Sequence, residues 1–153
     1  MEVSDSKISV DSDDPWDVDS VEIYVDRNLS KGFSYDQDDG QYRVDAEGNE
    51  TVGENDDPEN FKTSVVKVDG GYVVEARIKM ETKVGKKIGF DIQVNNDAGE
   101  GYRQSIMKWN DSTDQTYQSF EDIGELEMVG SKEVLLLFRS RILWRILAVA
   151  VSS

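Results

Sequence analysis

Cysteine and histidine are both absent from the 153 residues of the chain, and proline occurs only twice. Without cysteine the chain has neither disulfides nor thiol chemistry. The absence of histidine removes the commonest metal ligand and the commonest acid–base group at neutral pH. Zinc sites, haem sites and Ser-His-Asp catalysis are therefore disfavoured, whereas hard cations bound through oxygen, chiefly calcium, remain open.

Basic residues are also scarce, since 17 lysines and arginines face 32 aspartates and glutamates, for a formal net charge of −15. This balance argues against nucleic acids and anionic membranes as partners, because both attract positive charge. It favours uncharged ligands and cations, and it fits a soluble secreted protein. No signal peptide follows Met1, which indicates either a cytoplasmic protein or an internal piece of a larger one.

Short runs of alternating polar and apolar residues predominate before residue 130, where helical periodicity is weak. From Ser20 to Val25 the alternation predicts a strand with one buried face. Residues 62–68 and 72–80 flank Asp-Gly-Gly and predict a hairpin. Further strands are expected at 41–44, 88–94, 104–109 and 125–128, and residues 2–5 are typical of the end of a strand. The acidic stretch 45–59 is predicted to be loop or disordered.

This pattern predicts an all-β fold, an antiparallel sandwich of the jelly-roll or immunoglobulin-like kind. Residues 1–130 form one expected domain, and residues 131–153 form an apolar, basic tail. The tail approaches membrane-spanning length, but an arginine near its centre costs about 2.5–3.5 kcal/mol on insertion, which disfavours a membrane anchor. A docking segment and non-native or out-of-frame coding sequence remain alternatives.

Trp16 stands in an acidic run that should lie on a loop, where a flat apolar ring beside hydrogen-bonding groups suits a sugar. Carboxylate, amide and guanidinium groups hydrogen-bond to sugar hydroxyls, often in bidentate fashion, and residues with this role are called readers below. Candidate readers are Glu22, Arg43, Gln93 and Arg103, and further candidate platforms are Trp109 and Tyr117. For Glu22 and Arg43 the alternatives are a solvated face or a cross-strand ion pair. For Trp109 the alternative is a core position, and for Trp16 it is core or loop packing.

Loop carboxylates, Asp5 and Asp14 among them, are candidate ligands for a structural calcium ion. The acidic loop 36–40 departs from the EF-hand order, so a solvated carboxylate remains the alternative for each of these residues. A glycosidase needs two carboxylates about 5–10 Å apart across a cleft. Nothing in the sequence singles out such a pair, so catalysis is disfavoured.

Several ordered segments resemble the family 9 carbohydrate-binding module over roughly residues 2–128. They are residues 14–26, 41–44, 71–76, 88–95 and 109–111. The resemblance implies an extracellular, non-catalytic β-sandwich that binds reducing ends of xylan or glucan chains and small sugars, with structural calcium. It also implies a neighbouring glycosidase domain, which the module targets to plant cell-wall polysaccharide.

By this resemblance Trp16 and Tyr117 enclose the terminal sugar. Its hydroxyls are read by Glu22, Arg43, Gln93, Arg103 and Asp114, while Trp109 is assigned to structure. The sequence departs from the family where Tyr117 replaces tryptophan, where Asp114 replaces an amide, and in lacking the N-terminal strands of the sandwich. These departures favour the alternative function, a structural β-sandwich domain of a secreted or surface protein that has lost sugar binding.

Overall fold

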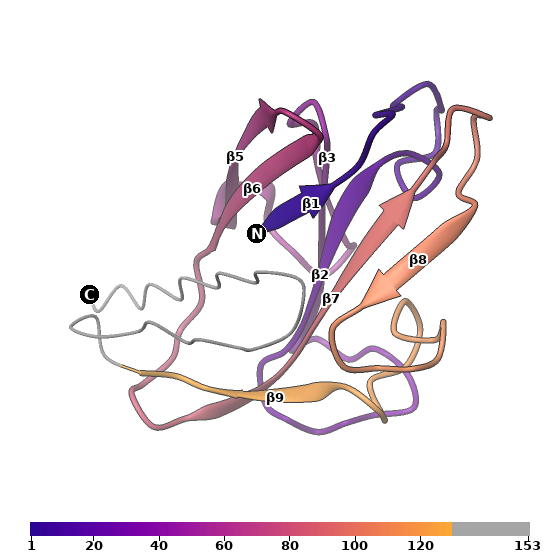
Figure 1. Ribbon diagram of the computed structural model, residues 1–153. Helices are drawn as coiled ribbons and strands as arrows, with labels where there is room; N and C mark the ends of the chain where they lie inside the picture. Colours follow the sequence, from indigo (N-terminus) through magenta and orange to yellow (C-terminus); the bar gives the residue numbers. More distant parts are fainter. Residues whose placement is uncertain (130–153) are drawn as a thin grey trace.

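The computed structural model describes residues 1–129, which contain nine strands and one short 3-10 helix (Figure 1). The strands are β1 (Glu2–Ser4), β2 (Ser20–Asp26), β3 (Asp39–Asp45), β4 (Glu50–Val52), β5 (Phe61–Val68), β6 (Gly71–Ile78), β7 (Lys87–Asn96), β8 (Ser105–Lys108) and β9 (Gly124–Glu127). The helix η1 (Pro58–Asn60) leads into β5. All strand pairs are antiparallel, and the all-β sandwich prediction is confirmed.

Two sheets enclose the main core. The small sheet has the order β1-β6-β5, and the large sheet has the order β4-β3-β2-β7-β8, with β9 also paired to β7. In Figure 1, β2 and β7 run side by side through the middle of the molecule. Val21, Ile23 and Val25 of β2 belong to one apolar cluster with Phe61 of β5 and Tyr72 of β6. The apolar face of β2 is therefore packed against the small sheet, and its polar face is left for other contacts.

The polar face of β2 is nevertheless buried, because all seven residues of the strand are inaccessible. The prediction of a single buried face is wrong in this respect. Tyr24 packs edge-on against Phe120, with ring centroids 6.4 Å apart, and Ile123 completes this second cluster. The chain after β8 thus covers part of the face that the alternation assigned to solvent.

The predicted hairpin is present as β5 and β6, with Gly70 in the left-handed region at φ 76°. The stretch 45–59 is not a continuous loop, because β4 pairs with β3 and η1 follows it. Strand β4 escaped the sequence criteria since it has only three residues within an acidic run. Trp109 is partly buried 5.9 Å from the Phe90 ring, in agreement with its assignment to structure.

Within residues 1–129, no helix has the length and apolar character needed to cross a membrane. The predicted apolar tail at 131–153 lies outside the described residues. The domain boundary at residue 130 therefore stays a prediction.

Candidate functional site

A row of polar side chains crosses the large sheet on the face turned away from the main core. Glu22 of β2 lies directly opposite Arg43 of β3 on one side and Gln93 of β7 on the other. Gln93 in turn lies opposite Lys108 of β8. Directly opposed residues of antiparallel strands share a face, so strand register alone brings three of the predicted sugar readers together.

Glu22 is the most heavily hydrogen-bonded member of this row and is 1% exposed. Its Oε2 accepts from Arg43 Nη2 at 3.0 Å, Gln41 Nε2 at 2.7 Å and the Tyr24 hydroxyl at 2.9 Å. Its Oε1 accepts from Asn95 Nδ2 at 2.8 Å. Burial alone would raise the pKa of Glu22, but the Arg43 charge and these donors lower it. The solvated-face alternative is therefore wrong, and the cross-strand ion pair is present.

Trp16 lies on the loop before β2 and is 44% exposed, so it is not a core residue. The guanidinium carbon of Arg43 is 5.7 Å from the centroid of its ring. Arg43 Nη1 donates to Thr51 Oγ1 at 3.2 Å, while its buried Nε has no hydrogen-bond partner within the described residues. Arg43 thus joins an exposed aromatic ring to the desolvated Glu22 carboxylate.

Asn95 connects this pair to the remaining readers, although sequence reasoning missed it. Its Nδ2 also donates to Ser20 Oγ at 2.9 Å, and its Oδ1 accepts from Gln93 Nε2 at 2.7 Å and Arg103 Nη1 at 3.2 Å. The predicted strand ended at residue 94, whereas β7 continues to Asn96. The period-2 spacing from Gln93 was the signal that could have placed Asn95 on the same face.

Arg103 reaches the loops on either side of the row. Its Nη2 lies 3.4 Å from Asp114 Oδ2, and its backbone N–H donates to Asp17 Oδ1 at 3.3 Å. Asp17 is the neighbour of Trp16 in the chain, so both loops are fastened to one residue. Six of the seven predicted sugar-site residues thus form a connected cluster: Trp16, Glu22, Arg43, Gln93, Arg103 and Asp114.

Tyr117 is 53% exposed on the same loop as Asp114, but it makes no hydrogen bond to this cluster within residues 1–129. The loop itself is well anchored. Asp111 accepts from Lys108 Nζ at 2.9 Å and from the Thr116 hydroxyl. Burial would raise the pKa of Asp111, yet hydrogen bonds from Thr116 and Lys108 lower it to about 2. The segment that presents Asp114 and Tyr117 is therefore anchored by a carboxylate that is ionised at neutral pH.

The two predicted calcium ligands lie in different settings. Asp5 is half-buried and accepts from the Lys7 backbone N–H at 2.8 Å. Burial, and then the charge of Asp5, raise the pKa of Asp19, so these two carboxyl groups are neighbours. Asp14 is exposed, and its carbonyl accepts from the Asp17 N–H in a turn. Among residues 1–129, no group of three or more acidic side chains is arranged to hold a metal ion.

Residues 1–131 match the family model described as "Carbohydrate family 9 binding domain-like". The chain belongs to this family. The resemblance drawn from the sequence motifs is thereby confirmed, as is the assignment to a non-catalytic carbohydrate-binding domain.

Curated relatives are much longer than this chain. Endo-1,4-beta-xylanase A of Thermotoga maritima is 38% identical over 130 residues, which cover 83% of this chain and 12% of that protein. Exoglucanase XynX of Acetivibrio thermocellus is 34% identical over 138 residues, which cover 88% of this chain and 13% of that protein. The chain thus corresponds to a small part of each of these relatives.

Solved structures of the family share the fold. A family 9 carbohydrate binding module from Caldicellulosiruptor kristjanssonii, in complex with cellotriose, is 30% identical, with a TM-score of 0.81. The match covers 91% of this chain and 72% of that one. A second structure, in complex with glucose, has a TM-score of 0.79 at 30% identity and covers 88% and 72% of the two chains.

Proposed function

We propose that this domain binds the ends of xylan or glucan chains at the cluster formed by Trp16, Arg43, Glu22, Asn95 and Arg103. The observation that carries the proposal is the desolvated Glu22–Arg43 pair directly beside an exposed tryptophan ring. Burying such a pair is costly unless its geometry is fixed by further hydrogen bonds, and here those bonds exist. These bonds hold the Arg43 guanidinium in a fixed orientation beside the Trp16 ring.

The chemistry of the cluster suits a neutral sugar. The C–H face of a pyranose packs on the Trp16 ring, while its hydroxyls meet the donors of Arg43 and Arg103 and the carboxylate of Asp114. The buried Nε–H of Arg43 has no partner among residues 1–129, and an ordered water would satisfy it. A neutral ligand is also compatible with the net charge of −15, which would repel an anionic one.

Tyr117 is the proposed second wall. It is exposed, and Arg103 and Asp114 draw its loop toward the polar row. The preference for reducing ends rests on the family resemblance, and the cellotriose and glucose complexes of family members support a site for both an oligosaccharide and a single sugar.

We further infer an extracellular setting, in which the domain holds a glycoside hydrolase on plant cell-wall polysaccharide. Support comes from the relatives, which are named as xylanases and an exoglucanase and are about eight times longer than the matched segment, since that segment is 12–13% of their length.

Calorimetry on the full chain tests the sugar site. Cellobiose and xylobiose should bind in native form, and the borohydride-reduced sugars should bind at least about tenfold more weakly. Trp16→Ala should abolish binding with an unchanged circular dichroism spectrum, whereas Val84→Ala, which removes a distant exposed side chain, should bind as the unaltered chain does. Equal binding of reduced sugars would reject the preference for reducing ends, and unaltered binding by Trp16→Ala would reject the site.

One observation favours the alternative, a structural domain without sugar affinity. The carboxylate of Glu22 already accepts from four protein donors, and Asp114 is paired with Arg103. These two acceptors are thus partly satisfied by the protein itself. A folded chain that binds none of the four sugars would establish this alternative.

We also propose a structural calcium ion at Asp5. The neighbouring carboxyl groups of Asp5 and Asp19 fit a cation, because it would relieve their repulsion, and oxygen is the donor that calcium prefers. Asp14, the other predicted ligand, is exposed on its loop and serves as the comparison. Residues 1–129 supply these two carboxylates and not three, so backbone carbonyls or water would complete the coordination.

Thermal unfolding with and without calcium tests this proposal. Saturating calcium should stabilise the chain by about 2–3 kcal/mol at a hundredfold excess over Kd. Asp5→Asn should remove most of this gain, and Asp14→Asn should leave it. A calcium effect that depends on Asp14 instead would relocate the ion, and no calcium effect on the unaltered chain would reject it.

A further inference from the structure

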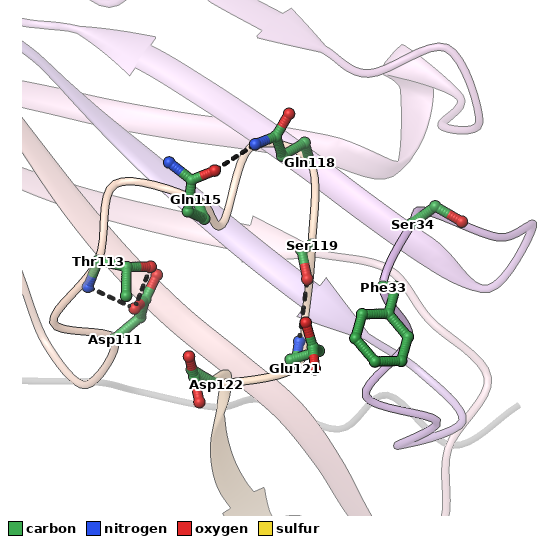
Figure 2. Close-up of a pocket in the computed structure, with 9 residues that line it drawn as sticks. All are labelled: Phe33, Ser34, Asp111, Thr113, Gln115, Gln118, Ser119, Glu121 and Asp122. Atoms are coloured by element: carbon green, nitrogen blue, oxygen red, sulfur yellow. Dashed lines mark hydrogen bonds between the residues drawn. The ribbon is translucent and has the colours of Figure 1, made fainter.

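A cavity lies beside the loop that carries Asp114 and Tyr117, lined in part by Thr113, Gln115 and Gln118 of the same loop. Its volume is about 450 Å³, within the range of about 300–1,000 Å³ that is typical of ligand pockets. Its walls come from the loop after β2 and the loop after β8, as Figure 2 shows. None of the seven predicted sugar-site residues lines it. The cavity is therefore distinct from the cluster at Trp16.

Phe33 forms one wall of this cavity and is 82% exposed. The loop that presents it is strained, because Leu29 and Lys31 are non-glycine residues in the left-handed region, at φ 59° and 51°. The buried carboxylate of Asp26 holds this conformation by accepting from the N–H groups of Ser30 at 3.2 Å and Lys31 at 2.9 Å. Backbone strain of this kind clusters at ligand sites, and here it keeps an apolar ring in solvent at the edge of a polar cavity.

The two walls are tied together without any ligand. The N–H of Phe120 donates to the Gly32 carbonyl at 2.9 Å, and the Tyr35 hydroxyl donates to the Thr116 carbonyl at 2.6 Å. The rings of Tyr35 and Phe120 also pack against each other in a tilted arrangement, with centroids 4.4 Å apart and an interplanar angle of 45°. The cavity is thus preformed, which lowers the entropic cost of binding.

The polar lining offers both donors and acceptors. Gln118 Nε2 donates to Gln115 Oε1, and Gln115 Nε2 donates to the Asp114 carbonyl at 2.9 Å, so each amide retains a second N–H. The carboxylates of Glu121 and Asp122 accept no hydrogen bond and form no ion pair within residues 1–129. An aromatic ring beside amides and free carboxylates is suited to a neutral polyhydroxylated ring and disfavours anions.

We propose that this cavity is a second carbohydrate-binding site, in which a neutral sugar unit packs on Phe33 and hydrogen-bonds to Gln115, Gln118 and Asp122. It shares the ligand class of the Trp16 site but none of its residues, although one loop carries residues of both sites. Two sites on one domain raise the affinity for a polysaccharide surface through effective concentration, without any new contact at the first site.

Nuclear magnetic resonance of the side-chain amides separates the two sites. The full chain carrying Trp16→Ala is titrated with cellobiose and xylobiose. The amide signals of Gln115 and Gln118 should still shift, while those of Gln93 and Asn95 no longer do. Adding Phe33→Ala should weaken the remaining binding at least about tenfold, and Phe33→Tyr should restore it. The Phe33 ring is too exposed to support the fold, so circular dichroism should be unchanged.

Binding to insoluble xylan supplies the second measurement. Phe33→Ala alone should lower retention on the polymer, whereas Val84→Ala should not. The proposal is overturned if the Gln115 and Gln118 signals do not respond to sugar, or if their response survives Phe33→Ala. It is also overturned if calcium alone reproduces their shifts, because Glu121 and Asp122 would then form a cation site.

Discussion

At the scale of single residues, Glu22 shows how a buried charge is kept in a domain without histidine or cysteine. Each of its oxygens accepts from the protein, and Arg43 supplies the opposite charge at 3.0 Å. Burial raises the pKa of the Tyr24 phenol, so that hydroxyl stays protonated and donates to Glu22. All four hydrogen bonds to Glu22 therefore require an ionised carboxylate, whose two oxygens act only as acceptors.

Replacement of Glu22 by glutamine should therefore be costly, although the two side chains have the same shape. The amide introduces N–H donors that face existing donors, and Arg43 loses its counterion. We expect a loss of about 3 kcal/mol in the free energy of unfolding, measured by denaturant titration, because removing one partner of a buried pair leaves the other uncompensated. Sugar affinity measured by calorimetry should fall in parallel.

Glu47→Gln provides the matched comparison, since Glu47 pairs with Lys67 at 3.2 Å on the surface, with both side chains about half exposed. Its loss should stay below about 1 kcal/mol. Equal costs for the two substitutions would mean that burial does not distinguish these ion pairs.

At the scale of elements, alternation and turn chemistry predicted most strands but not what covers them. Strand β2 followed from the spacing of Val21, Ile23 and Val25, and the β5–β6 hairpin followed from its Asp-Gly turn. Burial of the second face depends on Phe120, about a hundred residues away in the chain, and local pattern carries no such information. Strand β4 was missed because its pairing with β3, and not its composition, makes it a strand.

The residues of the candidate site likewise divide into those that local pattern predicted and those that it did not. Residue pattern placed Glu22 and Arg43 on the polar faces of their strands, and register then brought them into contact. Asp114 was reached only through the family resemblance, because loops carry no periodicity. Tyr117 was named as a candidate platform from its aromatic ring, and only the resemblance assigned it to the wall opposite Trp16. Asn95 was missed since the end of β7 is set by its pairing with β8. A hydrogen-bond hub of this kind becomes visible only when the strands are aligned.

The attachment of β1 to β6 depends on a glycine at the start of β6. A Cβ at Gly71 would lie 1.9 Å from the Val3 carbonyl oxygen, which is backbone and cannot move aside as a side chain would. Gly71→Ala should therefore displace β1 and lower the free energy of unfolding by about 2 kcal/mol or more. Hydrogen exchange should show loss of protection at Val74, whose N–H donates to the Met1 carbonyl at 2.8 Å.

Gly53→Ala is the comparison for this substitution, because its Cβ would meet only ordinary contacts at 3.5 Å or more and its φ is not positive. We expect little change in stability for Gly53→Ala. If both variants keep full protection at Val74, the close approach at Gly71 does not determine whether β1 stays attached to β6.

At the scale of the whole molecule, buried aspartates make the stability of the fold depend on pH in opposite directions. Burial alone would raise the pKa of Asp97, but hydrogen bonds from Ser9 and from loop N–H groups lower it to about 2, so its stabilising contribution is lost only as the pH falls toward 2. Asp39 behaves oppositely. Burial, and then the charges of Asp36 and Asp26, raise its pKa to about 6. Asp26 lies directly opposite Asp39 in the β2–β3 pair, and both are inaccessible.

The sign for Asp39 follows from linkage. Because the folded state binds the proton more tightly than the unfolded chain, the contribution of Asp39 is fully present below its ordinary pKa of 3.8 and is lost as the pH rises through about 6. Asp39→Asn removes this loss. We expect the variant to match the unaltered chain near pH 4 and to exceed it by up to about 3 kcal/mol at pH 7, since the pKa rises from 3.8 to about 6 and each pKa unit corresponds to about 1.4 kcal/mol.

Denaturant titrations at several pH values between 3.5 and 7.5 measure this difference, and the contributions of Asp97 and Asp111 cancel because both chains contain them. Asp13→Asn serves as the matched variant, since it removes the same charge from an exposed position and should show no step near pH 6. A step of equal size in both variants would trace the effect to net charge. A step confined to Asp39→Asn would trace it to the buried carboxyl pair across β2 and β3.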